Sequence, residues 1–117
     1  MTVLPLPPSH RFPHGRVCMT SRVIDLVRRG ELDALGCLER HLAADWGDVP
    51  QVDKQANDAG LSGGDLLVSR YKNSGAETLV ILTIQSRRLT KLMLGVALHG
   101  PCVYVVMSVP RHLASGV

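Results

Sequence analysis

The spacing of hydrophobic residues changes once along the chain, near Gly63 and Gly64. Before this point apolar residues recur at intervals of three and four, as in Leu35, Leu38 and Leu42, which predicts amphipathic helices. After it, stretches rich in Leu, Val, Ile and Thr alternate with turn residues, which predicts strands. The pattern indicates an α+β domain, with N-terminal short helices packed on a three- to four-stranded, mainly antiparallel sheet.

Capping residues mark three expected helices, the first preceded by a short strand over residues 16–20. Their expected limits are Thr20 or Ser21 to Gly30, Asp33 to about Trp46, and Asp48 to about Ala59, with Asp48 as the acidic cap, Pro50 in the first turn and Gly60 as the stop. Later strands are expected over residues 65–71, 77–84, 89–96 and 102–109. The first two of these form a hairpin, because turn residues lie between them.

A stretch without charged residues, 92–110, is nearly long enough to cross a bilayer as a helix. His99, Gly100 and Pro101 interrupt it, so we predict two buried strands joined by a turn instead. Around this domain, 16–110, we expect an extended arm, 1–15, and a loose tail, 111–117.

Composition bounds the class of protein. The chain has 117 residues, 45% of them hydrophobic but only 3% aromatic, so one mainly aliphatic core is expected and Trp46 stands out. The three cysteines are widely spaced, so we expect neither a disulfide framework nor a metal or cofactor site. The proline-rich start does not resemble a secretory signal, and a cytoplasmic location is expected.

The net charge of +3 conceals an acidic middle. Residues 30–65 hold eight acids against Arg40 and Lys54, whereas the segments on both sides are basic. If these regions form separate faces, the molecule is bipolar and each face attracts a different partner. In the alternative arrangement they pack together and neutralise each other.

The loop Asp45-Trp46-Gly47-Asp48 combines a large ring, a flexible residue and two carboxylates. In a structural interpretation, Trp46 is buried and Asp48 caps the next helix. In the competing interpretation, an exposed Trp46 anchors a basic partner. The burial of Trp46 distinguishes the two.

Residues with catalytic potential are His41 on the second helix and Ser69, Tyr71 and Thr83 on the hairpin. A histidine base facing hydroxyl groups and nearby cations has the chemistry needed for RNA cleavage by 2′-hydroxyl attack. Alternating polar residues are equally typical of a strand's solvent face. Cys37 lies one helical turn from His41, but no further ligand is evident, so a metal site is not expected.

Several motifs support a family resemblance. They are the run Arg40-His41-Leu42-Ala43-Ala44-Asp45-Trp46-Gly47-Asp48, then Asp53-Lys54, Asn57-Asp58, Leu67-x-Ser69-x-Tyr71 and Thr83. In these residues the chain resembles a family of short proteins carried by bacterial plasmids and integrative elements, which typically show Arg-His-x-x-Gly-Asp-Trp-Gly-Asp and are often labelled after restriction-modification systems. The resemblance covers residues 12–94. Ala44 replaces the family's first glycine, and Ile84 replaces an acid.

The resemblance and the acidic middle together suggest a non-enzymatic accessory protein of a mobile genetic element that binds a host or defence complex, as anti-CRISPR or antirestriction inhibitors do. Its expected binding residues are Asp45, Trp46, Asp48, Asp53, Asn57 and Asp58. The partner is expected to be a protein or nucleoprotein, and direct nucleic-acid binding is not favoured. One alternative is a small RNase or toxin using His41, similar in pattern to the barnase, EndoU and RelE group. Another is a structural homodimer subunit built on the strands within residues 92–109.

Overall fold

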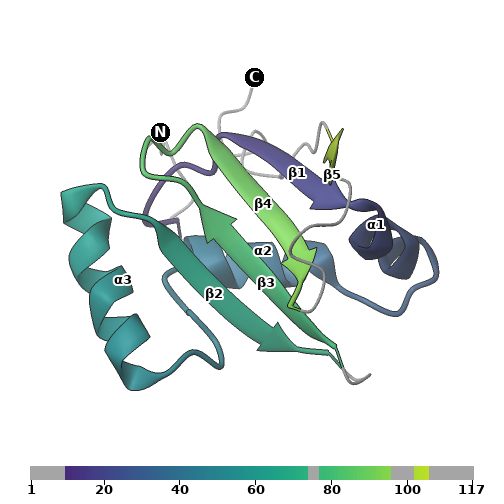
Figure 1. The fold of residues 1–117 in the computed structure, drawn as a ribbon, viewed down its shortest axis with the longest axis horizontal. Coiled ribbons are helices and arrows are strands. Elements are labelled where there is room, and N and C mark those ends of the chain that lie inside the picture. Colours follow the sequence, from purple (N-terminus) through teal and green to yellow (C-terminus); the bar gives the residue numbers. More distant parts are fainter. Residues whose placement is uncertain (1–9, 74–76, 96–101, 106–117) are drawn as a thin grey trace, which may run out of the picture.

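The computed structural model describes residues 10–73 and 77–95, together with the backbone of residues 102–105. These residues form an α+β unit of three helices and a five-stranded sheet (Figure 1). In chain order the elements are β1 (Arg16–Thr20), α1 (Ser21–Arg28), α2 (Ala34–Leu42), α3 (Gln51–Gly63), β2 (Leu67–Lys72), β3 (Thr78–Thr83), β4 (Leu89–Leu94) and β5 (Cys102–Val105).

The strand order in the sheet is β2-β3-β4-β1-β5. β2, β3 and β4 form an antiparallel meander, whereas β1 runs parallel to β4, with Arg16 opposite Leu89. β5 pairs antiparallel with the other side of β1. The first strand of the chain therefore lies between the last two, and the two buried strands expected around residues 92–110 are separated by β1. They do not form a hairpin with each other.

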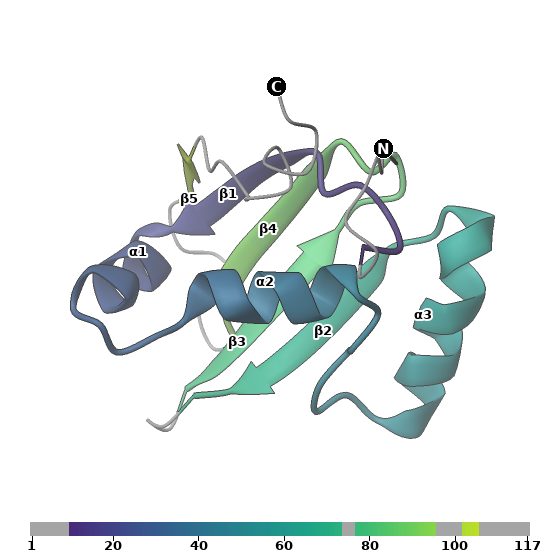
Figure 2. The same cartoon turned by 180° about the vertical axis from the view of Figure 1, so that it is seen from behind.

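The helices cover one face and one edge of the sheet. α2 crosses a face of the sheet, α1 lies beyond the carboxyl end of β1, and α3 stands beside the β2 edge (Figure 2). Alternate residues of β1, β2, β3 and β4 face α2 and form the core with Leu38 and Leu42 of that helix. The strand residues in this core are Val17, Met19, Leu67, Tyr71, Leu79, Ile81, Leu92 and Leu94.

Local capping explains where the first two helices begin. Thr20 accepts a hydrogen bond from the Val23 amide at 3.4 Å, and Asp33 accepts one from the Gly36 amide at 2.9 Å. Each side chain satisfies a backbone donor that has no partner within the helix. These caps confirm the predicted starts of both helices.

The α+β class and the packing of helices on a mainly antiparallel sheet are confirmed, but several boundaries differ. α2 ends at Leu42 and α3 extends to Gly63, beyond the expected stop at Gly60. Leu35, expected on the buried stripe of α2, is 36% exposed. No side chain caps α3, since its N-cap residue is Pro50, and the Asp48 carboxylate accepts from another part of the chain.

Part of the expected N-terminal arm belongs to the folded unit. His10, Phe12 and His14 are buried, and the Arg11 amide donates to the Leu42 carbonyl oxygen at 2.7 Å. Residues 1–9 and the expected tail lie outside the described residues. Within the described part, no helix combines the length and apolar character needed to cross a membrane.

Candidate functional site

His41 lies at the centre of a buried polar layer made of His41, Ser69, Thr83 and Thr90. Its Nδ1 is 2.6 Å from the Ser69 hydroxyl oxygen, and its Nε2 is 2.9 Å from the Thr83 hydroxyl oxygen. All four residues are fully buried between α2 and the sheet. They are brought together because Ser69, Thr83 and Thr90 face α2 from three adjacent strands.

The chain of hydrogen bonds assigns the protons in this layer. The Thr90 hydroxyl donates to the backbone oxygen of His14 at 2.7 Å, so Thr83 must donate in the 2.8 Å contact between Thr83 and Thr90. Thr83 then accepts from Nε2–H of His41, and Nδ1 accepts from Ser69. The layer fits a neutral imidazole protonated on Nε2.

The surroundings of His41 keep it neutral. Burial, followed by the positive charge of Arg87, lowers the pKa of His41 from 6.5 to about 3. The Arg87 guanidinium is held nearby by the carbonyl oxygens of Asp65 and Gly60, and it lies over the Phe12 ring at 5.6 Å from the centroid. At neutral pH the imidazole therefore carries no charge.

Two aromatic rings enclose the imidazole. Phe12 meets it edge-on with 5.3 Å between the ring centroids, and Trp46 does so at 5.6 Å. Phe12 and Trp46 also stack on each other. Trp46 is 4% exposed and donates its indole N–H to Asp58 at 2.9 Å, so the structural interpretation of Trp46 is confirmed and the exposed anchor is wrong.

The loop of residues 46–48, which we call the edge loop, covers the outer edge of β2. The Arg70 amide donates to the Trp46 carbonyl oxygen at 3.1 Å, and the Asp48 amide donates to the Arg70 carbonyl oxygen at 2.7 Å. The Asp48 carboxylate accepts from the Lys72 amide at 3.2 Å. Asp48 thus pairs with backbone groups of the edge strand β2 and does not cap α3, so the predicted cap was wrong.

Gly47 makes this close approach possible. It adopts φ +74°, and a β-carbon at this position would lie 2.1 Å from the Arg70 carbonyl oxygen. Any other residue would push the edge loop away from β2. The glycine of the motif is therefore needed for backbone pairing.

Asn57 forms hydrogen bonds with the backbone of Val68, further along the same edge of β2. Its amide nitrogen donates to the Val68 carbonyl oxygen at 2.8 Å, and its amide oxygen accepts from the Val68 amide at 3.2 Å. Because Asn57 is buried in this contact, it is not available to a partner. With the edge loop, it leaves the β2 edge closed to strand addition.

Ala44 takes the position where the resembled family has glycine. α2 ends in a Schellman motif, in which the Asp45 amide donates to the Arg40 carbonyl oxygen at 2.9 Å and the Ala44 amide donates to the His41 carbonyl oxygen at 3.0 Å. Ala44 therefore has φ +66°, a left-handed conformation that favours glycine.

Four carboxylates of the predicted site remain exposed and form what we call the acidic surface: Asp45, Asp48, Asp53 and Asp58. Three of them also stabilise the fold. Asp45 accepts from the Arg40 guanidinium, Asp48 from the Lys72 amide and Asp58 from the Trp46 indole. The hydrogen bond from Arg40 is the main cause of the lowered pKa of Asp45. Asp53 has no side-chain hydrogen bond or ion pair within the described part of the chain.

The structure does not offer His41 as a catalytic base. Both ring nitrogens already have hydroxyl partners, and no atom of the side chain reaches solvent. Tyr71 is buried as well, and its hydroxyl donates to the Asp45 carbonyl oxygen at 2.5 Å. No group of three metal-ligating side chains lies together among the described residues. The arrangement is that of a structural layer.

Sequence reasoning missed two members of this arrangement, Phe12 and Thr90, and counted Arg87 only among the cations near the hairpin. A signal existed for Phe12, since it is the only phenylalanine in a chain with few aromatic residues. Thr90 lies among core positions of β4, where a hydroxyl needs a buried partner. For Arg87 no local pattern indicates its place beside Phe12.

Comparison of the chain with protein-family models, curated proteins and solved structures found no match.

Proposed function

We propose that the protein is a non-enzymatic binding protein that docks through α3 and the acidic surface onto a basic partner. The observation that carries this proposal is the exposure of α3. Of its 13 residues only Asn57 and Gly60 are buried, and Val52 is 68% exposed beside Asp53. An apolar side chain among carboxylates suits a partner that offers both a hydrophobic contact and positive charge.

The acidic surface keeps most of its charge unpaired. In the described part of the chain, only the ion pair between Arg40 and Asp45 joins a cation to this surface within 4.0 Å. That pair is half-exposed on both sides and contributes little to stability. The remaining carboxylates favour steering toward a basic groove, which supports the bipolar arrangement over neutralisation by packing.

The class of partner follows from the chemistry of this surface. Carboxylates spaced over α3 and the segment before it resemble the phosphates of a nucleic acid, so a nucleic-acid-binding groove is the complementary site. A restriction complex or a nucleic-acid-guided defence complex of the host has such a groove. The protein would then act as an accessory factor of a mobile element that occupies it.

The test measures binding of the full chain to purified restriction and nucleic-acid-guided complexes at low and high salt. Asp53→Asn and Val52→Ser should each weaken binding by about threefold to tenfold, and salt should weaken it further. Asp25→Asn and Val27→Ser make matched changes on exposed positions of α1 and should leave binding unchanged. Equal losses in both pairs of variants, or no binding by the unmodified protein, would contradict the proposal.

The homodimer stays a separate prediction. β4 is an interior strand, so both of its edges are already paired within the chain. Light scattering across a range of protein concentrations tests for the dimer, and a constant monomer mass would exclude it.

A further inference from the structure

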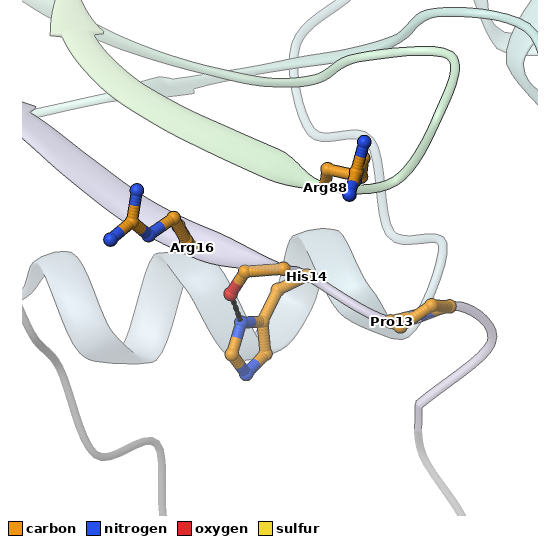
Figure 3. Close-up of a pocket in the computed structure, with 5 residues that line it drawn as sticks. Pro13, His14, Arg16 and Arg88 are labelled. Atoms are coloured by element: carbon orange, nitrogen blue, oxygen red, sulfur yellow. Dashed lines mark hydrogen bonds between the residues drawn. The ribbon is translucent and has the colours of Figure 1, made fainter.

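A hollow lies where the chain enters β1 beside the start of β4. Its lining residues are Pro13, His14, Gly15, Arg16 and Arg88, and we call it the arginine hollow (Figure 3). None of these residues is acidic. It shares no residue with the acidic surface, so an inference drawn from it does not depend on the proposed function.

The backbone around the arginine hollow is fixed at two points. The Arg16 amide donates to the Arg88 carbonyl oxygen at 2.9 Å, and the Thr90 hydroxyl donates to the His14 carbonyl oxygen at 2.7 Å. The second bond connects the hollow to the buried polar layer. The segments that carry the two arginines are therefore held by the core.

Gly15 allows these segments to approach each other. It adopts φ +67°, and a β-carbon here would lie 2.3 Å from the Arg88 carbonyl carbon. At this distance any residue other than glycine would force the backbone to move. As a result, Arg16 at the start of β1 and Arg88 just before β4 border one space.

Both arginine side chains are exposed, and within the described residues neither forms an ion pair. The ion pairs found there engage other cations, namely His10, Arg22, Arg29 and Arg40. The two guanidinium groups project away from the His14 ring, which points to the opposite side of the segment (Figure 3). Two charged donors without a carboxylate partner form an attractive site for an anion.

The wider sheet surface adds charge of the same sign. Ser69 and Thr90 face α2, so their neighbours Arg70 and Lys91 lie on the opposite face of the sheet. Arg16 lies on this face too, since Val17 is in the core. Arg16, Arg70 and Lys91 therefore share the face that α2 does not cover, although the buried apolar side chains of Val80 and Met93 lie on it too.

We propose that the arginine hollow binds a phosphate group, with the guanidinium groups of Arg16 and Arg88 donating hydrogen bonds to its oxygens. The planar guanidinium matches two oxygens of one phosphate, and two such groups match its charge. The phosphate comes either from a small molecule or from a nucleic-acid backbone, because both present the same oxygens.

Two titrations of the full chain distinguish these sources. The first follows backbone amide shifts of the ¹⁵N-labelled protein with inorganic phosphate at constant ionic strength. The second follows the fluorescence anisotropy of a short labelled single-stranded oligonucleotide. We expect saturable shifts at Gly15, Arg16 and Arg88 in the first titration if small molecules are bound, and binding only in the second if the site needs a polymer.

The variants Arg16→Gln and Arg88→Gln should each weaken binding about tenfold. Arg28→Gln removes an exposed arginine of α1 outside the hollow and should change binding less than about twofold. Amide spectra of all variants check that the fold is retained. The proposal is overturned if neither ligand binds saturably, or if Arg28→Gln weakens binding as much as the hollow variants, which would indicate diffuse charge attraction.

Discussion

The Arg40–Asp48 run has two halves, the end of α2 with His41 and the following loop with Asp48. Both halves carry polar residues, but in different surroundings. His41 lies under the sheet, where all its hydrogen bonds go to side chains that water does not reach. Asp48 lies along the sheet edge, where it bonds backbone groups next to solvent. Water can replace a partner lost at the edge, but it cannot enter the buried polar layer without disrupting it. Depth, more than residue type, therefore sets how much each half of the run contributes to stability.

The largest effect is expected when His41 is removed. His41→Ala leaves the Ser69 hydroxyl without its acceptor and removes the N–H that donates to Thr83, which keeps its bond to Thr90. The change also opens a cavity beside Trp46. Together these losses should lower the free energy of unfolding by about 3–5 kcal/mol. Urea unfolding followed by Trp fluorescence measures this difference.

The control for this variant is Gln55→Ala, on the exposed side of α3, which should change stability by less than about 0.5 kcal/mol. A loss of under about 1 kcal/mol for His41→Ala would show that the layer relaxes or admits water. The comparison between the two halves of the run would then fail.

The second largest effect is expected at low pH, where protonation of His41 should lower the free energy of unfolding. Because the pKa of His41 is lowered from 6.5 to about 3, the unfolded chain takes up a proton below pH 6.5 while the folded chain does not. The stability contributed by the neutral imidazole is complete above pH 6.5 and is lost as the pH falls toward 3. Between pH 6.5 and pH 4 the loss should reach about 3 kcal/mol.

Urea midpoints at several pH values in this range test the sign and size of the effect. His41→Gln retains hydrogen-bonding groups but does not titrate, so its stability should vary less with pH. Asp45, whose pKa is lowered mainly by the hydrogen bond from Arg40, adds a loss of stability only at the acid end of this range, and it does so in both proteins. Parallel pH profiles for the unmodified protein and His41→Gln would refute the assignment.

A smaller effect is expected at the edge. Trp46→Phe keeps an aromatic ring but loses the indole hydrogen bond to Asp58, and it should cost about 1–2 kcal/mol. Asp58→Ala removes the same bond from the other side. In a double-mutant cycle the two changes should couple by about 0.5–1 kcal/mol. Asp53→Ala, on the same helix without a bond to Trp46, should show no coupling to Trp46→Phe.

Much of the fold could be predicted because its signals are local. Thr20 and Asp33 cap helices wherever the following residues are helical, and the strand segments have the composition of strands. The place of β1 could not be predicted this way. Its partner β4 is distant in the chain, and no local pattern specifies a parallel pairing between Arg16 and Leu89.

The candidate site was predicted only in part, for a related reason. The sequence indicated the run around Trp46 and its burial, but the partners of Asp48 depend on tertiary structure. A carboxylate before a helix can accept from the helix or from a neighbouring backbone, and here Lys72 of β2 is the donor. Similarly, the depth of His41 depends on the rotation of α2 against Ser69 and Thr83.

The smallest expected effect comes from the residue that joins the two halves. Ala44 holds φ +66° at the end of α2, which costs an L-residue with a β-carbon about 1 kcal/mol relative to glycine. Ala44→Gly should therefore raise the free energy of unfolding by about 0.5–1 kcal/mol, despite the greater freedom of glycine in the unfolded chain. Ala43→Gly, one residue earlier with φ −88°, should instead lower it. If both glycines destabilise equally, the Schellman end of α2 does not hold in solution, and the edge loop needs another anchor.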